Sequence, residues 1–393
     1  MGNITSKLST TVPSKSKIIV FFIIVLFFIS CDLQKEKQDP VIKNGQIDLS
    51  NWDYETIKLN GKWLHFPNKY KDPSKPIFSN QNFGQVPGYL IGDGFDTYQL
   101  RIITSGQQPQ LAIKIGQIYT SYTLFVNGKQ RLSAGITGTK EENSLPGVKY
   151  DHTVLGDGKV HDITLYVANY SHTRRGIRDP IEIGKIENIK NSSLVHTIYS
   201  MFLMGAILTF VLQNIFLFFA YKKDKSTIYF ALLCIPLLCF IILHRSDVTV
   251  NSWFVFFVYV RILHLAATVF PILVLRFIDA LYDQVQLYPD ILKRLFNMVA
   301  LCFTIINVIA PIKFLDNISM KGLIIYLLGF IALVVYSLTR ATLKNLIGAK
   351  WLLAACFFII FTFLVDLGFH YGAFYIPVKL TPLGLFSIVF AMS

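Results

Sequence analysis

Apolar and polar positions alternate between about residues 40 and 190. Four segments place apolar side chains at every second position: Tyr98, Leu100 and Ile102; Leu111, Ile113 and Ile115; Tyr122, Leu124 and Val126; Ile163, Leu165 and Val167. Because successive side chains of a strand point to opposite faces, this period of two predicts strands with one buried face. Asn127-Gly128 follows the third segment and favours a type I′ hairpin turn. We therefore expect residues 40–190 to form an all-β domain, a jelly roll or β-sandwich.

Long apolar runs replace this alternation in the second half. Seven runs lie at about 196–220, 226–243, 252–276, 295–312, 322–338, 350–369 and 380–393. Runs of roughly 17–25 apolar residues can cross a bilayer as helices. The last run has 14 residues, or roughly 21 Å of helix, against a hydrocarbon core of about 30 Å. We therefore expect an α-helical multi-pass membrane domain of the seven-helix type over residues 196–393. Its last helix is expected to be truncated.

The N-terminus has the pattern of an export signal. Polar and basic residues precede an unbroken apolar run of 12 residues, Ile18 to Ile29, which is too short to span a bilayer. Ser30-Cys31 follows and is similar to a bacterial lipobox, although Phe28 stands where leucine is common. We predict a signal segment over residues 1–31, with Cys31 as a candidate for lipidation. An ordinary signal segment and an uncleaved anchor are the alternatives.

Composition agrees with a membrane protein. Of 393 residues, 53% are hydrophobic and only 16% charged, whereas soluble domains carry roughly 25% charged residues. The net charge of +13 divides into +3 for residues 1–31, +3 for 32–192 (20 basic, 17 acidic) and +7 for the membrane half (14 basic, 7 acidic). No basic stripe with stacking aromatics accompanies it, so no nucleic-acid partner is expected. Residues 32–192 also contain no cysteine, so the β domain must fold without a disulfide.

The basic residues between the apolar runs predict an orientation. If the β domain is exported, the inner loops hold nine Lys or Arg residues and the outer loops four, as the positive-inside rule requires. The export signal points the same way. We expect a bacterial inner-membrane protein with residues 32–192 on the extracytoplasmic side.

An ordered series of short motifs runs through the β half. It comprises Trp52-Asp53-Tyr54, Leu59-Asn60-Gly61-Lys62-Trp63, Val86-Pro87-Gly88, Gly94 to Leu100, Tyr122 to Gly128, Asn169-Tyr170-Ser171-His172 and Pro180 to Gly184. The series resembles the extracytoplasmic domain of bacterial seven-transmembrane receptors with diverse intracellular signalling modules. That domain is similar to galactose-binding jelly rolls. The apolar runs that follow strengthen the resemblance over residues 45–393.

The resemblance implies a signal-transduction receptor rather than an enzyme, with no cofactor. Its β domain would sense a ligand, perhaps a carbohydrate or another small molecule, and the helix bundle would pass the signal to a cytoplasmic effector. Family members normally continue past helix seven into that effector, but this chain stops at Ser393. We therefore expect a truncated receptor. Membrane lipids are the other expected partners.

Six residues of the β half are candidates for ligand binding, and each has a structural alternative. Trp63 and Tyr98 could form a sugar platform or belong to the core. The densest polar cluster contains His172, Arg174, Arg175 and Arg178. Arginine makes forked hydrogen bonds to carboxylate and phosphate, so this cluster could bind an anionic or sugar ligand. A solvated surface and docking onto lipid headgroups are the alternatives.

Three polar residues inside the apolar runs are further candidates. Arg261 and His264 lie one helical turn apart and share a face, and Asp366 falls at a broadly similar depth in the sixth run. The prediction is an Arg261–Asp366 ion pair that holds the bundle or its signalling state. Separate snorkelling of the two side chains is the alternative.

Rival functions remain open from the sequence. An envelope polysaccharide transporter would need a polar pathway at mid-membrane, which only Arg261, His264 and Asp366 could supply. A membrane enzyme with a sugar-binding module would need a convergent acid–base set. A scaffold whose β domain binds a protein is the third. The chain contains no Walker loop, GxSxG elbow, HExxH pair or paired CxxC, and its eight histidines lack metal-ligand spacing.

Overall fold

The computed structural model describes residues 40–370 except 76–81, 89–93, 107–108, 171, 173–175, 222–223, 244–249, 251 and 316–318, together with residues 380, 383, 384 and 387. The predicted signal segment and Cys31 lie outside these residues. So does most of the predicted seventh helix. The chain divides into two compact units, and residues 39–337 form the larger one.

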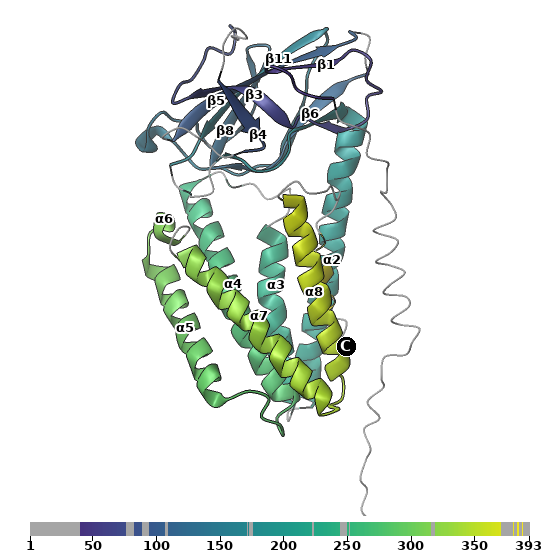
Figure 1. Cartoon of the computed structure of the whole chain (residues 1–393), viewed down its shortest axis with the longest axis vertical. Helices are drawn as coiled ribbons and strands as arrows, with labels where there is room; N and C mark the ends of the chain where they lie inside the picture. Colours follow the sequence, from purple (N-terminus) through teal and green to yellow (C-terminus); the bar gives the residue numbers. More distant parts are fainter. Residues whose placement is uncertain are drawn as a thin grey trace, which may run out of the picture. The chain divides into compact units, whose positions relative to one another are not determined.

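The first half of the larger unit is a β-sandwich (Figure 1). Its strands are β1 (Gln46–Leu49), β2 (Ile57–Lys58), β3 (Gly61–Pro67), β4 (Phe83–Val86), β5 (Phe95–Thr104), β6 (Leu111–Ile115), β7 (Ile118–Tyr119), β8 (Ser121–Val126), β9 (Lys129–Ala134), β10 (Asp151–Val154), β11 (Val160–Ala168), β12 (Gly176–Ile177) and β13 (Glu182–Lys185). The seven-stranded sheet has the order β4-β3-β5-β11-β8-β9, with β1 parallel to β5. The four-stranded sheet has the order β10-β6-β13-β2, and β12 pairs with β7.

The four alternating segments form β5, β6, β8 and β11, as predicted. Their twelve alternating apolar side chains are all buried and belong to one core cluster with residues of both larger sheets. The Asn127-Gly128 turn joins β8 to β9, and both residues have positive φ (50° and 77°). The period of two therefore identified the apolar core face correctly. The expectation of a single buried face was wrong, because intervening residues such as Thr97, Gln99 and Thr164 are buried as well.

Six helices are long and apolar enough to cross a membrane, counting only the described part of the chain. They are α2 (Ile186–Ala220), α3 (Lys225–Leu243), α4 (Trp253–Leu281), α5 (Asp290–Ile309), α7 (Met320–Leu343) and α8 (Ala349–His370), and the three-residue α6 (Ile312–Phe314) follows α5. Within the larger unit, α3 packs against α2 and α4, and α4 packs against α5. Ala300 of α5 forms a buried cluster with Leu323 and Tyr326 of α7.

The first helix begins ten residues before its expected start at residue 196. α2 follows β13 directly at Ile186 and runs for 35 residues (Figure 1). Its first turns are polar, which is why the hydropathy pattern missed them, and they contact β6 and β13. Ile189 is fully buried there, and the Ile186 backbone nitrogen donates to the Gln110 carbonyl at 3.0 Å. One continuous helix therefore leads from the small sheet into the membrane half.

Candidate functional site

A second connection joins the β domain to the membrane half at the start of α4. Val148, in the loop before β10, pairs with Val250 in an isolated antiparallel bridge. The Val148 nitrogen donates to the Val250 carbonyl at 3.0 Å, and the reverse bond measures 2.9 Å. This backbone pairing holds Val250, three residues before α4, against the β domain.

Apolar side chains bury this contact. We call the following residues the junction cluster: Tyr119 and Val148 of the β domain, Val250, Phe256, Tyr259 and Val260 in and before α4, and Ile312 of α6. Phe256 is fully buried and Val250 is 1% exposed, whereas Val255 and Phe257 on either side of Phe256 are each 38% exposed. Ser252 caps α4 by accepting a hydrogen bond from the Val255 nitrogen at 3.2 Å, so the helix begins at the cluster.

Aromatic rings continue the junction cluster. The His172 ring stacks on Tyr119 with centroids 4.7 Å apart and meets Phe256 edge-on at 6.1 Å. Trp253 packs edge-on against Phe256 at 5.9 Å. Aromatic contacts of this geometry contribute about 0.5–1.5 kcal/mol each beyond the burial of their area. His172 thus bridges the β domain and α4.

Hydrogen bonds hold the β-domain side of the cluster. Gln117 donates from its side chain to the Tyr119 hydroxyl at 2.6 Å, and its backbone nitrogen donates to the Asp179 carboxylate at 2.9 Å. The Arg178 nitrogen donates to the Gln117 carbonyl at 3.0 Å. Burial, and next the charge of Asp179, raise the pKa of Tyr150 well above its ordinary value. Tyr150 therefore stays neutral well above physiological pH. Through its hydrogen bonds, Gln117 links Arg178 and Asp179 to the hydroxyl of Tyr119.

Trp63 and Tyr98 lie in the core instead of on a ligand-binding surface. Trp63 is fully buried and donates from its indole nitrogen to the Leu59 carbonyl at 2.9 Å. Tyr98 is 1% exposed and stacks on His65 at 4.6 Å. Because β3 and β5 turn these residues towards the second sheet, neither ring has a face available to a sugar. The structure places both rings in the core cluster.

The predicted polar cluster is only partly described. Arg174 and Arg175 lie outside the described residues. Arg178 is half-buried beside Gln117, and His172 is in contact with the junction cluster. Of the predicted polar cluster, His172 takes part in the contact between the β domain and α4.

The intramembrane candidates have individual partners. Arg261 donates from Nη2 to the Ala310 carbonyl at 2.8 Å and lies over the Phe257 ring at 4.1 Å. His264 Nδ1 lies 2.9 Å from the Val260 carbonyl in the preceding turn. Asp366 accepts a hydrogen bond from the Leu380 nitrogen at 2.7 Å, at the start of the predicted last span. The Arg261–Asp366 ion pair stays a prediction.

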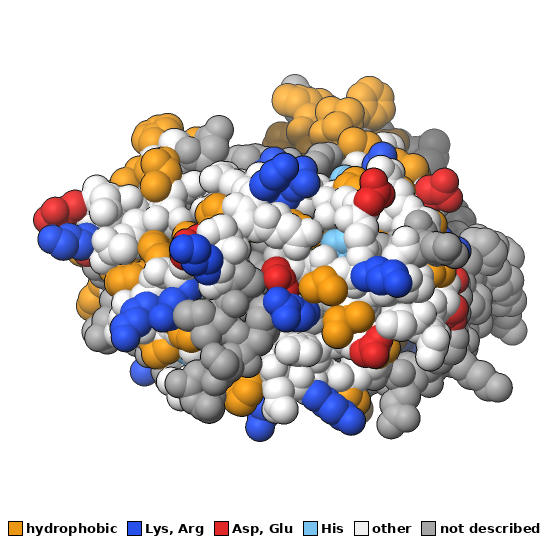
Figure 2. Space-filling model, turned by 90° about the horizontal axis from the view of Figure 1, so that it is seen from above, with side chains coloured by type: hydrophobic (Ala, Val, Ile, Leu, Met, Phe, Trp, Pro, Cys, Tyr) orange, Lys and Arg blue, Asp and Glu red, His pale blue; other side chains and the backbone are white. Residues whose placement is uncertain are grey.

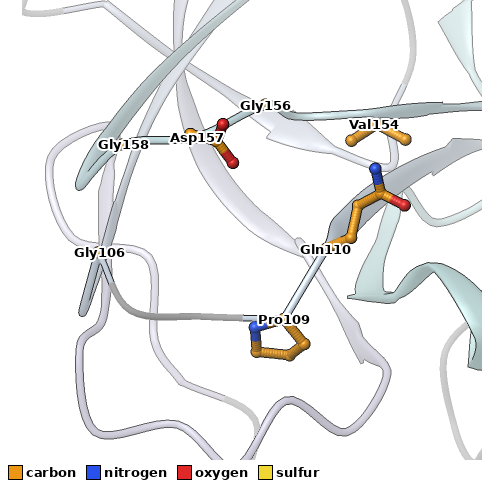
Figure 3. A pocket seen from close by; sticks show the side chains of 7 residues that line it. All are labelled: Gly106, Pro109, Gln110, Val154, Gly156, Asp157 and Gly158. Carbon is orange, nitrogen blue, oxygen red and sulfur yellow. The ribbon is translucent and has the colours of Figure 1, made fainter.

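One hollow in the surface of the β domain is small. The loops after β5 and before β11 enclose about 150 Å³ lined by Gly106, Pro109, Gln110, Val154, Gly156, Asp157 and Gly158 (Figure 3). Pockets for drug-sized ligands usually measure roughly 300–1,000 Å³ and carry several convergent polar groups. Here the drawn side chains offer only Gln110 and Asp157. Among the described residues, no three His, Cys, Asp or Glu side chains lie close enough to hold a metal ion.

Charge on the β domain is mixed where it can be seen. Figure 2 shows Lys and Arg interspersed with Asp and Glu on the coloured part of the upper face. This distribution agrees with the near-balanced charge of residues 32–192 and favours no polyanionic partner for that face.

Sequence reasoning missed the residues that make the junction cluster. Phe256 lies within the apolar run 252–276, where hydropathy does not distinguish it from its neighbours. Tyr119 and Val148 lie outside the four alternating segments and the apolar runs. Ser252 before an apolar run is a capping signal that could have placed the start of α4. The pairing of Val148 with Val250 crosses about a hundred residues of sequence and has no local signal.

One family model matches residues 196–393, and its description is 7TM diverse intracellular signalling. The chain belongs to this family. No curated protein matches the chain in sequence. As a member of this family the chain is a multi-pass membrane protein with a signalling role, and the receptor domain is a sensor. Its apolar helices contact membrane lipid.

Solved structures resemble parts of the chain distantly. A β-glucuronidase from Faecalibacterium prausnitzii is 12% identical with a TM-score of 0.26, covering 38% of this chain and 32% of its own. A calcium-binding mutant of Bacteroides uniformis β-glucuronidase 2 is 13% identical with a TM-score of 0.27, covering 33% and 18%. The chain thus spans a third or less of the length of these proteins.

Proposed function

We propose that the β domain is the extracytoplasmic ligand sensor of this receptor and that the junction cluster passes its state to α4. The supporting observation is the buried contact of Tyr119 and Val148 with the start of α4. The family implies signalling across a membrane, and a signal needs a physical route from the sensor to the helices. A packed contact with few arrangements can serve as that route, because packed interfaces switch between discrete states.

The proposed ligand is a carbohydrate or another small molecule with anionic or hydroxyl groups. Support comes from the arginines around Arg178, whose guanidinium groups suit carboxylates and sugar hydroxyls. This segment leads into His172 and Tyr119. A ligand that moved the segment would therefore change the packing of the junction cluster directly. A cytoplasmic effector would receive the signal from the helix bundle, in line with the family description.

The route is tested by substituting one side of the junction cluster and observing the other. In full-length protein in detergent, Tyr119→Ala should speed amide hydrogen exchange in the first two turns of α4. The reason is that Tyr119 and Phe256 belong to the same buried cluster, and His172 contacts both rings. Tyr166→Ala is the control, since Tyr166 stacks on Tyr70 at 4.4 Å inside the β domain. Equal acceleration in both variants, or none in Tyr119→Ala, would overturn the route.

Ligand binding is tested separately with thermal stabilisation. The full-length protein is heated with a panel of neutral and acidic mono- and oligosaccharides. A binder present at about a hundred times its Kd should stabilise the native state by about 2.7 kcal/mol. Arg178→Gln should reduce the shift for an acidic sugar. A panel without any shift would reject the carbohydrate class.

A further inference from the structure

One face of helix α2 is exposed along its spanning part. Only 17% of that part of α2 is buried, against 44% of the span of α3, with which α2 is in contact. The buried residues Leu203 and Ile207 lie four residues apart on one side of the helix. The other side carries Phe202 and Phe216, which are 58% and 71% exposed. The helix therefore has one packed side and one open side.

A polar amide lies within the open side. Gln213 is exposed and follows Gly205 and Thr209 at intervals of four residues, so the three lie on one face of α2. α2 ends at Ala220, which is roughly 10 Å further along the helix axis than Gln213. The first basic residue after the helix is Lys222. In a hydrocarbon core of about 30 Å, Gln213 is therefore well inside the apolar region.

The neighbouring polar side chains of α2 are satisfied by their own helix, whereas Gln213 is not. Thr209 donates from Oγ1 to the Gly205 carbonyl at 2.9 Å, and Asn214 donates from Nδ2 to the Phe210 carbonyl at 2.9 Å. No described residue forms a hydrogen bond with the Gln213 amide. Lipid tails offer neither donors nor acceptors, so an unpaired amide at this depth is strongly unfavourable. The position therefore calls for a hydrogen-bonding partner outside the described helices.

The backbone beside this amide is open to a second helix. Gly205 is exposed, and a Cβ atom there would have no neighbouring atom within 4 Å. Small residues in spanning helices allow backbones to approach closely, so that side-chain amides reach across the contact. The Gln213 amide has both donors and an acceptor. Two copies of it related by a twofold axis can therefore each donate to the other.

We propose that a second copy of this chain packs on the open side of α2, with the Gln213 amides of the two copies hydrogen-bonded to each other. A single self-complementary residue satisfies both copies, whereas an unrelated protein would have to supply its own polar group at this depth. The side that bears Leu203 and Ile207 takes no part, so the contact is compatible with the packing of α2 inside one chain. The dimer does not depend on the sensor function proposed for the β domain.

Cysteine cross-linking of the full-length protein in native membranes tests which molecule covers the open side. Phe216→Cys places a thiol on that side and keeps Gln213. Oxidation should give a disulfide-linked product of twice the mass of the chain. The unsubstituted chain is the control for products of its own cysteines. Absence of the doubled mass, or a cross-link to a protein of another mass, would overturn the second copy as the occupant.

A second measurement separates the amide from apolar packing. By sedimentation equilibrium in density-matched detergent, Gln213→Leu should dimerise about tenfold more weakly than the wild type. Asn214→Leu is the matched control, because its amide lies at the same depth but is bonded to its own helix, and it should dimerise as the wild type does. Gly205→Leu should also weaken the dimer, although the open space beside Gly205 lets the monomer fold. Equal dimer affinity in all three variants would overturn the proposal.

Discussion

Backbone conformation decides which residue can occupy Gly94. Its φ is +136°, and a Cβ atom there would lie 2.2 Å from Cε1 of the Tyr170 ring. The Gly94 carbonyl also accepts from the Asn169 nitrogen at 2.7 Å, so the loop cannot move away without losing this bond. The sequence alone shows neither the positive φ of Gly94 nor its contact with the Tyr170 ring.

Gly94→Ala should therefore lower the free energy of unfolding by about 2 kcal/mol or more, through strain and the clash together. Gly156→Ala is the control, because Gly156 has φ +87° and no atom within 4 Å of its Cβ position. It should cost only about 1 kcal/mol. Denaturant unfolding of both variants measures the difference, and equal losses would show that the Tyr170 contact is unimportant.

His161 is a buried residue whose charge opposes folding. It is fully buried, and burial lowers its pKa, while the Gly158 backbone and Asp162 act in the opposite direction to a smaller extent. The unfolded chain keeps the ordinary pKa of about 6.5, so it binds more protons than the native state below that pH. The stability from neutral His161 is therefore present above about pH 6.5 and is lost as the pH falls.

The expected result is a lower free energy of unfolding at pH 5.5 than at pH 7.5 (about one unit on either side of the ordinary value). His161→Gln should make this decline shallower. Urea unfolding at the two pH values measures the effect, and an unchanged slope in His161→Gln would contradict it.

At the scale of elements, the start of α4 combines a cap, a buried face and an exposed face within one turn. Phe256 is fully buried in the junction cluster, whereas Phe254 is 75% exposed. Both belong to the same apolar run, so hydropathy alone gives them the same role. Only the contact with the β domain distinguishes them.

Phe256→Ala should cost roughly 3 kcal/mol or more, since it removes a buried ring and leaves a cavity. Phe254→Ala should cost little, because its ring already faces outward. The melting temperatures of the two full-length variants in the same detergent compare them directly. A similar fall for both would mean that Phe256 does not pack as described.

At the scale of the whole molecule, the charge of the loops predicts an orientation in the membrane. Nine basic residues in the expected inner loops against four in the outer ones predict an extracytoplasmic β domain. Glu141 in the β domain and Lys344 in the loop after α7 are both exposed, so each is open to chemical labelling.

Cells that express Glu141→Cys should react with a membrane-impermeant maleimide. Cells that express Lys344→Cys should react only after permeabilisation. The unsubstituted chain is the control for its own cysteines, four of which lie in helices α3, α5 and α8. The reverse pattern would place the β domain in the cytoplasm and would reject the export signal.

The sequence by itself determined the two-part organisation, the buried faces of β5, β6, β8 and β11, and six spanning helices. These features depend on local period and run length, which burial and bilayer thickness impose on every chain. It also placed His172 and Arg261 among the candidates, because charged or aromatic polar residues stand out from such patterns.

Tertiary structure alone decided which surfaces meet. The sequence alone allows Trp63 and Tyr98 to be core residues or part of a ligand-binding surface. The packing of the two sheets buries both rings. The early start of α2, the Val148–Val250 bridge and the bond from Arg261 to the Ala310 carbonyl all join segments far apart in the sequence or extend beyond an apolar run. Such contacts are selected by packing and by the need to pair buried polar groups, and neither leaves a periodic trace in the chain.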